Sequence, residues 1–482
     1  MSESIEHFPL MIPGAFSSDG VLELRAPYDQ TVLATLESAD ANAVDLALSN
    51  AYQLFINRDR WIPLAKRIEI LQRVKQNLID NAEKLAFEAA EEGGKPLFDS
   101  KIEVARAIEG IQICIETLRT NAGKMVPMGI NPACENRIAY TTHEPIGVVV
   151  AVSAFNHPLN LIVHQVIPAI AAGCPVIVKP AEDTPRSCMR LVKMIHDAGL
   201  AKEWCQALVT LEINVAEKLV TDSRIGLFSF IGSAKVGWML RSKLAPGVRC
   251  VLEHGGAAPV IVGPDANIDD AVPALAKGGL YHAGQVCVSV QRIFVHESIA
   301  EQITGGITST AKAMRIGNPT HQDTDIGPLI RQREIDRIHS WVEEAISAGA
   351  RCSTGGERIG ASCYAATILF NPPEFSKVSQ KEIFGPVICI YPYKNADQAV
   401  LRANKLPFAF QASVWTNNLD FALRTSQRLD ASTVMVNDHT AFRVDWMPFS
   451  GLRESGQGVG GIPYTLHDMQ IEKTTVIHCQ NI

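Results

Sequence analysis

The chain of 482 residues lacks the cysteine patterns of a disulfide-bonded or zinc-binding protein. It has eleven cysteines, an odd number, but no Cys-x-x-Cys pair and no cluster of cysteine and histidine at zinc-ligand spacing. Its first ten residues, MSESIEHFPL, show no basic segment followed by an apolar one, so they do not resemble a secretory signal peptide. We therefore expect reduced cysteines, no metal site and a cytoplasmic location.

The chain also lacks an excess of positive charge. Its 44 Lys and Arg residues are outnumbered by 51 Asp and Glu residues, which gives a net charge of -7. Nucleic acids attract basic surfaces, so nucleic-acid binding is disfavoured. The apolar (47%) and charged (20%) fractions are those of an ordinary soluble globular protein. The length suggests about three structural units.

Residues 145–178 contain no Asp, Glu, Lys or Arg, and this run is longer than the roughly 20 residues that cross a bilayer. Polar residues and four prolines interrupt the run. Its segments match a strand (146–152), a helix (159–171) and a second strand (175–178). Strands of a parallel sheet are covered by helices on both faces and are therefore apolar throughout. We expect a buried core here and no membrane contact.

Strand and helix patterns follow one another along the rest of the chain. Helices are expected at 64–90 and 99–122, and the segment 124–143 suits an extended excursion. Between 146 and 254, five strand patterns separated by helices predict a doubly wound parallel sheet, and from about 259 a second α/β unit begins. The strand pattern KTTVIHCQ near the end has no partner nearby in the sequence, which favours oligomerisation.

One Gly-x-Gly-x-x-Gly match is present, in the glycine-rich segment Gly456–Gly461. A dinucleotide-binding fingerprint follows a strand, opens a helix and belongs to a βαβ unit of about 30 residues. Only 21 residues follow this match. We therefore interpret the segment as a flexible loop and not as a nucleotide site.

Seven short segments carry a stronger signal. In chain order they are FNHP (155–158), KPAE (179–182), FIGS (230–233), LEHGG (252–256), GQVC (284–287), EIFGP (382–386) and PFSG (448–451). With the GGKP at 93–96, they make the chain resemble the aldehyde dehydrogenase superfamily over nearly its whole length. The separation of 34 residues between Glu253 and Cys287 is also that of the family. The resemblance implies an NAD(P)-dependent, hydrolytic enzyme that oxidises an aldehyde to the carboxylic acid.

The chemistry of this reaction explains why such residue types are needed. A thiolate that adds to the carbonyl carbon forms a tetrahedral thiohemiacetal, which can release a hydride to a nicotinamide. The resemblance gives this role to Cys287. It implies that the Asn156 side-chain amide and the backbone N–H of the cysteine stabilise the oxyanion that forms in this step. A thioester then remains, and Glu253 matches the general base that activates water to hydrolyse it.

The resemblance also implies where the cofactor binds. Its residues would be Phe155, Lys179, Glu182, Gly232, Ser233, Glu382 and Phe384. Lys179 and Glu182 match the pair at the adenine ribose, and the helix that Gly232-Ser233 opens can receive the pyrophosphate. Glu382 and Phe384 match the residues at the nicotinamide end. The Glu182 carboxylate repels the ribose phosphate of NADP, so we expect NAD to be preferred by roughly ten-fold or more, with NADP disfavoured and not excluded.

The implied fold is α/β, with a doubly wound Rossmann-like cofactor domain, an α/β catalytic domain and a small β extension. The cofactor domain would comprise residues 1–123 and 144–254, and the catalytic domain residues 255–450. The extension, residues 124–143 and 462–482, would join subunits into a homodimer or homotetramer. The expected partner is a small-molecule aldehyde.

The chain departs from the family pattern in places that leave alternatives open. His254 and Ala257 stand where the family usually has Leu and Lys, Ser450 stands where Gly is common, and Val459-Gly460 replaces the usual Arg-Glu. His254 is either a partly buried polar neighbour or a group that tunes the pKa of the general base.

Two other functions are compatible with the scaffold. One is a coenzyme-A-acylating dehydrogenase, although such relatives typically lack the glutamate at the position of Glu253. The other is a catalytically silent binding or structural protein, which would have no reason to keep Cys287, Asn156 and Glu253 together. The sequence does not identify the aldehyde.

Overall fold

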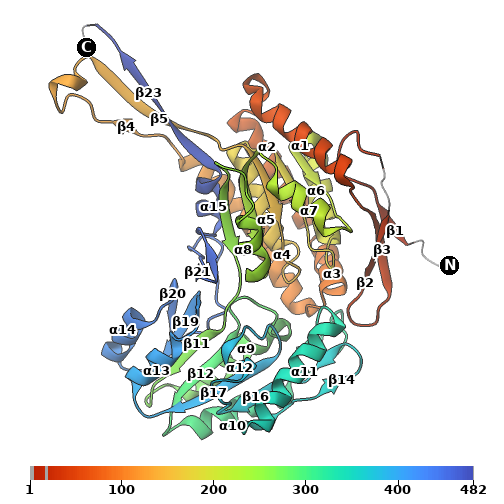
Figure 1. The fold of residues 1–482 in the computed structure, drawn as a ribbon, viewed down its shortest axis with the longest axis vertical. Helices are drawn as coiled ribbons and strands as arrows, with labels where there is room; N and C mark the ends of the chain where they lie inside the picture. The colour runs from red at the N-terminus through yellow and green to blue at the C-terminus, as the bar shows by residue number, and fades with distance from the viewer. Residues whose placement is uncertain (1–4, 17–19, 481–482) are drawn as a thin grey trace.

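The computed structural model describes residues 5–16 and 20–480. Two sheets, each packed against helices, form two halves of the molecule, and a narrow β arm extends from the first half away from the second (Figure 1). In the described part of the chain, no helix is both long and apolar enough to cross a membrane.

The first half contains a six-stranded sheet in the order β22-β10-β9-β6-β7-β8. Its strands are β6 (Val148–Val152), β7 (Val176–Lys179), β8 (Cys205–Ala207), β9 (Ile225–Ile231), β10 (Arg249–Glu253) and β22 (Gly456–Gln457). All neighbours are parallel except the edge pair β10 and β22. Taken in chain order, the five parallel strands have the 3-2-1-4-5 arrangement of a dinucleotide-binding fold. The expected doubly wound sheet is confirmed.

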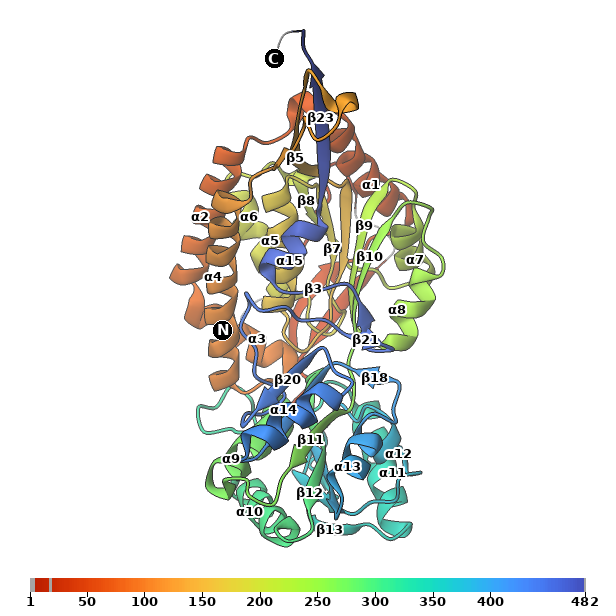
Figure 2. The same cartoon turned by 90° about the vertical axis from the view of Figure 1, so that its left-hand side faces the viewer.

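Helices cover both faces of this sheet (Figure 2). They are α1 (Ala41–Ile56), α2 (Leu64–Asp80), α3 (Ala82–Gly93), α4 (Leu97–Thr120), α5 (Asn160–Ala172), α6 (Arg186–Asp197), α7 (Ile213–Thr221), α8 (Ala234–Arg241) and α15 (Ile462–Asp468). Val149 and Ala151 join the core under α2 to α6, whereas Val148 and Val150 join the core under α1 and α7. Successive side chains of a strand point to opposite faces, so a strand covered on both sides is apolar at every position.

The second half contains a seven-stranded sheet in the order β13-β16-β17-β12-β11-β19-β20. Its strands are β11 (Ala258–Val262), β12 (Val290–His296), β13 (Arg351–Thr354), β16 (Thr367–Phe370), β17 (Val387–Tyr393), β19 (Gln411–Trp415) and β20 (Thr433–Val436). Its helices are α9 (Ile268–Leu280), α10 (Ala300–Ala313), α11 (Gln332–Ser347), α12 (Lys377–Gln380), α13 (Ala396–Ala403) and α14 (Leu419–Arg428). Only the edge strand β13 runs antiparallel to its neighbour in this sheet.

The arm is a three-stranded antiparallel sheet of β4 (Met125–Val126), β5 (Arg137–Pro145) and β23 (Gln470–His478). The terminal strand β23 therefore has a partner in its own chain, because Gln470 pairs with Pro145 and His478 with Arg137. A separate small sheet near the N-terminus consists of β1 (Glu6–Phe8), β2 (Val21–Arg25) and β3 (Val32–Glu37). Short two-stranded pairs are formed by β14 (Arg358–Ile359) with β15 (Cys363–Tyr364), and by β18 (Phe408–Ala409) with β21 (Leu452–Arg453).

Two local expectations are wrong. The single helix expected at 64–90 is interrupted at Asn81, whose side-chain amide donates to the Asn77 carbonyl at 2.8 Å and so competes with the helical backbone bonds. The glycine-rich segment is not a free loop, because Gly456 and Gln457 form an edge strand opposite Glu253 and Leu252, and Gly460 pairs with Phe449. Gly456 has φ of +154°, and a Cβ there would lie 2.3 Å from the Leu252 carbonyl oxygen, so only glycine fits beside β10.

Candidate active site

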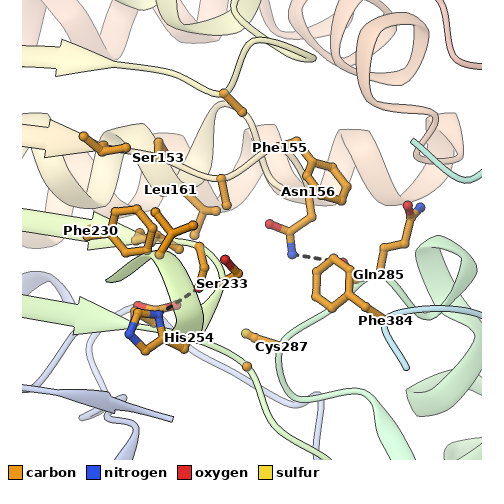
Figure 3. Close-up of a pocket in the computed structure, with 18 of the residues that line it drawn as sticks. Ser153, Phe155, Asn156, Leu161, Phe230, Ser233, His254, Gln285, Cys287 and Phe384 are labelled. Atoms are coloured by element: carbon orange, nitrogen blue, oxygen red, sulfur yellow. Dashed lines mark hydrogen bonds between the residues drawn. The ribbon is translucent and has the colours of Figure 1, made fainter. Parts of the chain in front are cut away.

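A cavity of about 1230 Å³ lies between the two halves, at the carboxyl ends of the strands of the first sheet. Open α/β sheets bind ligands at this edge. All ten residues that the sequence singled out line it: Phe155, Asn156, Lys179, Glu182, Gly232, Ser233, Glu253, Cys287, Glu382 and Phe384. Figure 3 shows the side chains of Asn156 and Cys287 directed into the same space.

Cys287 follows a tight reversal of the chain between α9 and β12. His282 and Ala283 within this reversal have φ of +51° and +53°, a conformation that side chains with a Cβ rarely adopt. Burial raises the pKa of the Cys287 thiol, and the nearby carboxylates of Glu253 and Glu382 raise it further, while the Arg443 guanidinium opposes them. The resting thiol is therefore protonated at neutral pH.

Glu253 is the last residue of β10, and its side chain is only 12% exposed. Its backbone carbonyl accepts a hydrogen bond from the Gly232 N–H at 3.1 Å, which ties the ends of β9 and β10 together. Burial raises the pKa of its carboxyl above the usual value, although Arg443 and Arg106 oppose this effect. Within the described residues, its Oε1 is buried without a hydrogen-bond partner. Such a group is suited to accept a proton from a water molecule.

Asn156 lies just after β6 and is 5% exposed. Its Nδ2 donates to the backbone carbonyl of Gln285 at 2.9 Å, two residues before Cys287 (Figure 3). An amide carries two N–H groups, so one anchors Asn156 to the cysteine loop and the other is left for a ligand. The loop is itself anchored, because Gln285 Oε1 accepts the Ile330 N–H at 3.0 Å.

Sequence reasoning did not assign a role to Lys95 and Glu103, which hold the turn of Asn156. Lys95 donates to the Asn156 carbonyl at 3.2 Å and forms a fully buried ion pair with Glu103. Glu103 Oε1 also accepts the backbone N–H groups of Leu159 and Asn160, each at 2.9 Å. The GGKP segment was the signal that could have pointed to Lys95.

The other end of the cavity is built by the ends of β7 and β9. Ser233 precedes α8 without a side-chain capping bond, so the first N–H groups of this helix are available to a ligand. Lys179 is buried and forms an ion pair with Glu182, whose side chain is 41% exposed. Burial acts to raise the pKa of Glu182, but the charge and hydrogen bond of Lys179, with a backbone N–H and the Arg331 charge, together keep that pKa below its usual value.

Glu382 and Phe384 approach the cavity from the second half. Glu382 Oε1 accepts the Gly256 N–H at 3.1 Å, and burial raises the pKa of its carboxyl to about 7. A Cβ on Gly255 would lie 1.5 Å from Glu382 Oε1, so this glycine makes room for the carboxylate. The Phe384 ring meets the Phe155 ring edge-on, with centroids 5.8 Å apart.

His254 is buried beside the cofactor end and points away from the Glu253 carboxylate. Its Nδ1 lies 2.8 Å from the Gly232 carbonyl, so this nitrogen carries the proton. The ring fills the space above Gly237, where a Cβ would lie 2.0 Å from Cε1. Burial lowers the pKa of His254, which makes it a neutral packing residue that supports the start of α8.

No group of three or more His, Cys, Asp or Glu side chains that could hold a metal ion occurs within residues 5–16 and 20–480.

Comparisons with known proteins agree with one another. The sequence model of the Aldehyde dehydrogenase family matches residues 16–475. The 3-sulfolactaldehyde dehydrogenase of Priestia megaterium is 35% identical over 476 residues, which cover 98% of each protein. The crystal structure of aldehyde dehydrogenase 21 from Physcomitrella patens, in complex with the reaction product succinate, is 31% identical with a TM-score of 0.94, over 98% of this chain and 99% of that one. The glyceraldehyde-3-phosphate dehydrogenase GapN from Methanocaldococcus jannaschii, complexed with NADP, is 30% identical with a TM-score of 0.90, over 96% and 100%.

Proposed function

The chain belongs to the aldehyde dehydrogenase family, and on this premise we propose that Cys287, Asn156 and Glu253 carry out the steps by which it oxidises an aldehyde. The overall activity is NAD(P)-dependent oxidation of an aldehyde to a carboxylic acid. The observation that supports these roles is that three distant segments bring a thiol, an amide and a carboxylate to one cavity.

Cys287 is the nucleophile in this proposal. Its thiol must lose a proton before Sγ attacks the carbonyl carbon, and among the charges around it Arg443 favours the thiolate. The attack converts the carbonyl oxygen into an oxyanion on a tetrahedral carbon. The free N–H of Asn156 and the backbone N–H of Cys287 stabilise this charge, and the bond to Gln285 keeps the amide oriented beforehand.

Glu253 is the base for the second stage. After the hydride has left, the acyl group is bound to Cys287 as a thioester. The Glu253 carboxylate takes a proton from a water molecule, whose oxygen attacks the thioester carbon; the bond to Sγ breaks, the acid is released, and Glu253 returns the proton to the leaving thiolate. The raised pKa makes Glu253 a stronger base than an exposed carboxylate.

The remaining residues of the cavity fit a nicotinamide dinucleotide. The uncapped start of α8 offers N–H groups to a pyrophosphate, and Glu182 and Glu382 line the same cavity with carboxylates for two ribose rings. We assign Lys179 to the adenine ribose with Glu182, and Phe155 and Phe384 to the nicotinamide side. When bound, the cofactor supplies the hydride acceptor.

We also propose the domain roles that the sequence predicts: residues 1–123 and 144–254 bind the cofactor, and residues 255–450 form the catalytic domain. The extension, residues 124–143 and 462–482, which includes most of the arm, is proposed to join subunits. Exposed apolar side chains on it support this role: Met125 is 68% exposed, Ile130 77% and Val476 54%.

The first prediction tests the reaction type. With neutral and anionic aldehydes and either cofactor, we expect reduced cofactor and free acid in equal amounts without coenzyme A, because Glu253 supplies a base for hydrolysis. Product analysis beside cofactor absorbance is the measurement. An absolute need for coenzyme A would identify an acyl-transferring enzyme. A protein that binds cofactor but turns over no aldehyde would be a silent binding protein.

The second prediction concerns the cofactor. We expect NAD to be preferred over NADP by about ten-fold or more in kcat/KM, because a carboxylate at the adenine ribose, where we place Glu182, would repel the extra phosphate of NADP. Glu182→Gln should reduce the ratio of kcat/KM with NAD to kcat/KM with NADP, mostly by raising kcat/KM with NADP. Asp197→Asn on α6 is the charge control, since the Asp197 carboxylate is bound to Lys193 at 2.8 Å and is not among the residues that line the cavity. A wild-type enzyme that prefers NADP would mean that another residue sets the choice.

A further inference from the structure

Two arginines line the cavity at the end where Cys287 and Glu253 lie. They are Arg106 of α4 and Arg443, which follows β20. Their side chains are 24% and 10% exposed. A guanidinium withdrawn from water needs a hydrogen-bonded or charged partner. The partners of each arginine therefore show whether its charge is already balanced within the protein.

Arg106 is fully engaged by the buried Asp445. Its Nε donates to Asp445 Oδ2 at 3.1 Å and its Nη2 to Oδ1 at 2.6 Å. The same Oδ1 lies 2.8 Å from His164 Nε2. Although burial acts to raise the pKa of Asp445, His164 and Arg106 lower it far below its usual value. The carboxylate is therefore ionised and balances the charge of Arg106.

Arg443 forms only longer ion pairs with two carboxylates and hydrogen-bonds to neither of them. Its nearest carboxylate oxygens are Glu253 Oε1, 3.7 Å from Nη1, and Asp445 Oδ1, 4.0 Å from Nε, and both separations exceed a hydrogen bond. Within the described residues its Nε is buried without a hydrogen-bond partner. The guanidinium is nevertheless held in place, because its Cζ lies 3.6 Å from the centre of the Phe449 ring.

The histidines around Arg443 are neutral and do not add positive charge. His164 Nε2 donates to Asp445, so its Nδ1 is an acceptor, and Arg443 Nη2 lies 3.4 Å from it. Burial lowers the pKa of both His164 and His157. His157 Nε2 bonds the Tyr281 hydroxyl at 3.0 Å. Arg443 is thus a fixed cation beside the reacting groups with N–H groups left over.

We propose that Arg443 binds an acidic group carried by the aldehyde, so that the substrate is a short aldehyde with a carboxylate or sulfonate at its far end. This specificity rests on the proposed function of Cys287 and Glu253. An anion completes the hydrogen bonding of the guanidinium in the bidentate manner that arginine favours. The chain between the two ends is short, because Arg443 lies 3.7 Å from Glu253 and its charge acts on the Cys287 thiol.

The third prediction tests this with two probes, 4-oxobutanoate and its methyl ester, which lacks the negative charge and adds one methyl group. We expect the wild-type enzyme to favour the acid by about a hundred-fold in kcat/KM, the effect of a hydrogen-bonded charge pair out of water. Arg443→Gln should lose most of this ratio, because it slows the acid far more than the ester, while loss of the charge that favours the Cys287 thiolate slows both probes alike. Arg443→Lys should keep part of the ratio, because it keeps the charge.

The acid-to-ester ratio separates binding of the anion from other effects of the substitution, since damage to the chemistry slows both probes alike. Arg424→Gln on α14 is the charge control, because Arg424 is 72% exposed and pairs with Asp397 outside the cavity. A second measurement needs no variant: succinate should inhibit the wild-type enzyme at least ten-fold more strongly than dimethyl succinate, which carries no carboxylate.

Each outcome decides between the two proposals. An enzyme that turns over the ester as fast as the acid would overturn the substrate class and leave the proposed function standing. If Arg443→Gln keeps the acid-to-ester ratio of the wild-type enzyme, the anion is bound by a residue other than Arg443. No turnover of any aldehyde would contradict the roles of Cys287 and Glu253 instead.

Discussion

Replacing Cys287 by alanine should abolish aldehyde oxidation, and this is our fourth prediction. We expect kcat/KM to fall by at least about ten-thousand-fold, as for other enzymes that have lost their nucleophile. Without Sγ no thiohemiacetal forms, and the planar aldehyde has no tetrahedral carbon from which hydride can leave. The cofactor should still bind, because the start of α8 and Glu182 are untouched. Steady-state turnover and titration with NAD measure the two properties separately.

Cys352→Ala is the matched control for this variant. Cys352 is another half-buried cysteine, on the edge strand β13 of the second sheet, and burial raises the pKa of its thiol as it does that of Cys287. Its removal should leave turnover within about two-fold of wild type, as expected for a change away from the chemistry. Substantial oxidation by Cys287→Ala would overturn the covalent route.

Replacing Glu253 by glutamine should separate the two stages of the reaction, which is our fifth prediction. We expect a burst of about one reduced cofactor per site and then a steady rate lowered by roughly a thousand-fold, because general base catalysis is lost only from hydrolysis of the thioester. Removing the carboxylate also removes a charge that raises the pKa of Cys287, so thiolate formation is not made harder. Rapid-mixing absorbance of the reduced cofactor gives both phases.

The pH dependence of the steady rate provides an internal check. Glu253 acts as a base only when ionised, and burial raises its pKa above the usual carboxyl value. The wild-type steady rate should therefore fall as the pH drops through this raised pKa, and the glutamine variant should lack that limb. If the burst and the steady rate decrease equally, Glu253 serves formation of the thioester and not its hydrolysis.

The fold was predicted from the sequence where local patterns suffice, and missed where they do not. The uncharged run 145–178 indicated buried parallel strands, because a strand covered on both faces is apolar at every position. The break at Asn81 was missed, since both flanking helices keep an apolar stripe and only the side-chain bond to Asn77 interrupts the ladder. The partner of β23 lies more than 320 residues earlier in the chain, and no local pattern could pair Gln470 with Pro145.

The sequence by itself determined the family, the parallel sheet and ten of the residues that line the cavity, because short motifs at strand ends and helix starts reflect local chemistry. Only the tertiary structure decided how side chains distant in sequence meet. It turned His254 away from Glu253 and against Gly237, and it bound the Asn156 amide to the cysteine loop. It also joined Arg106 to Asp445 across 339 positions and left Arg443 without a carboxylate at bonding distance. Charge balance within a buried site depends on distances in space, and those exist only once the two halves have packed together.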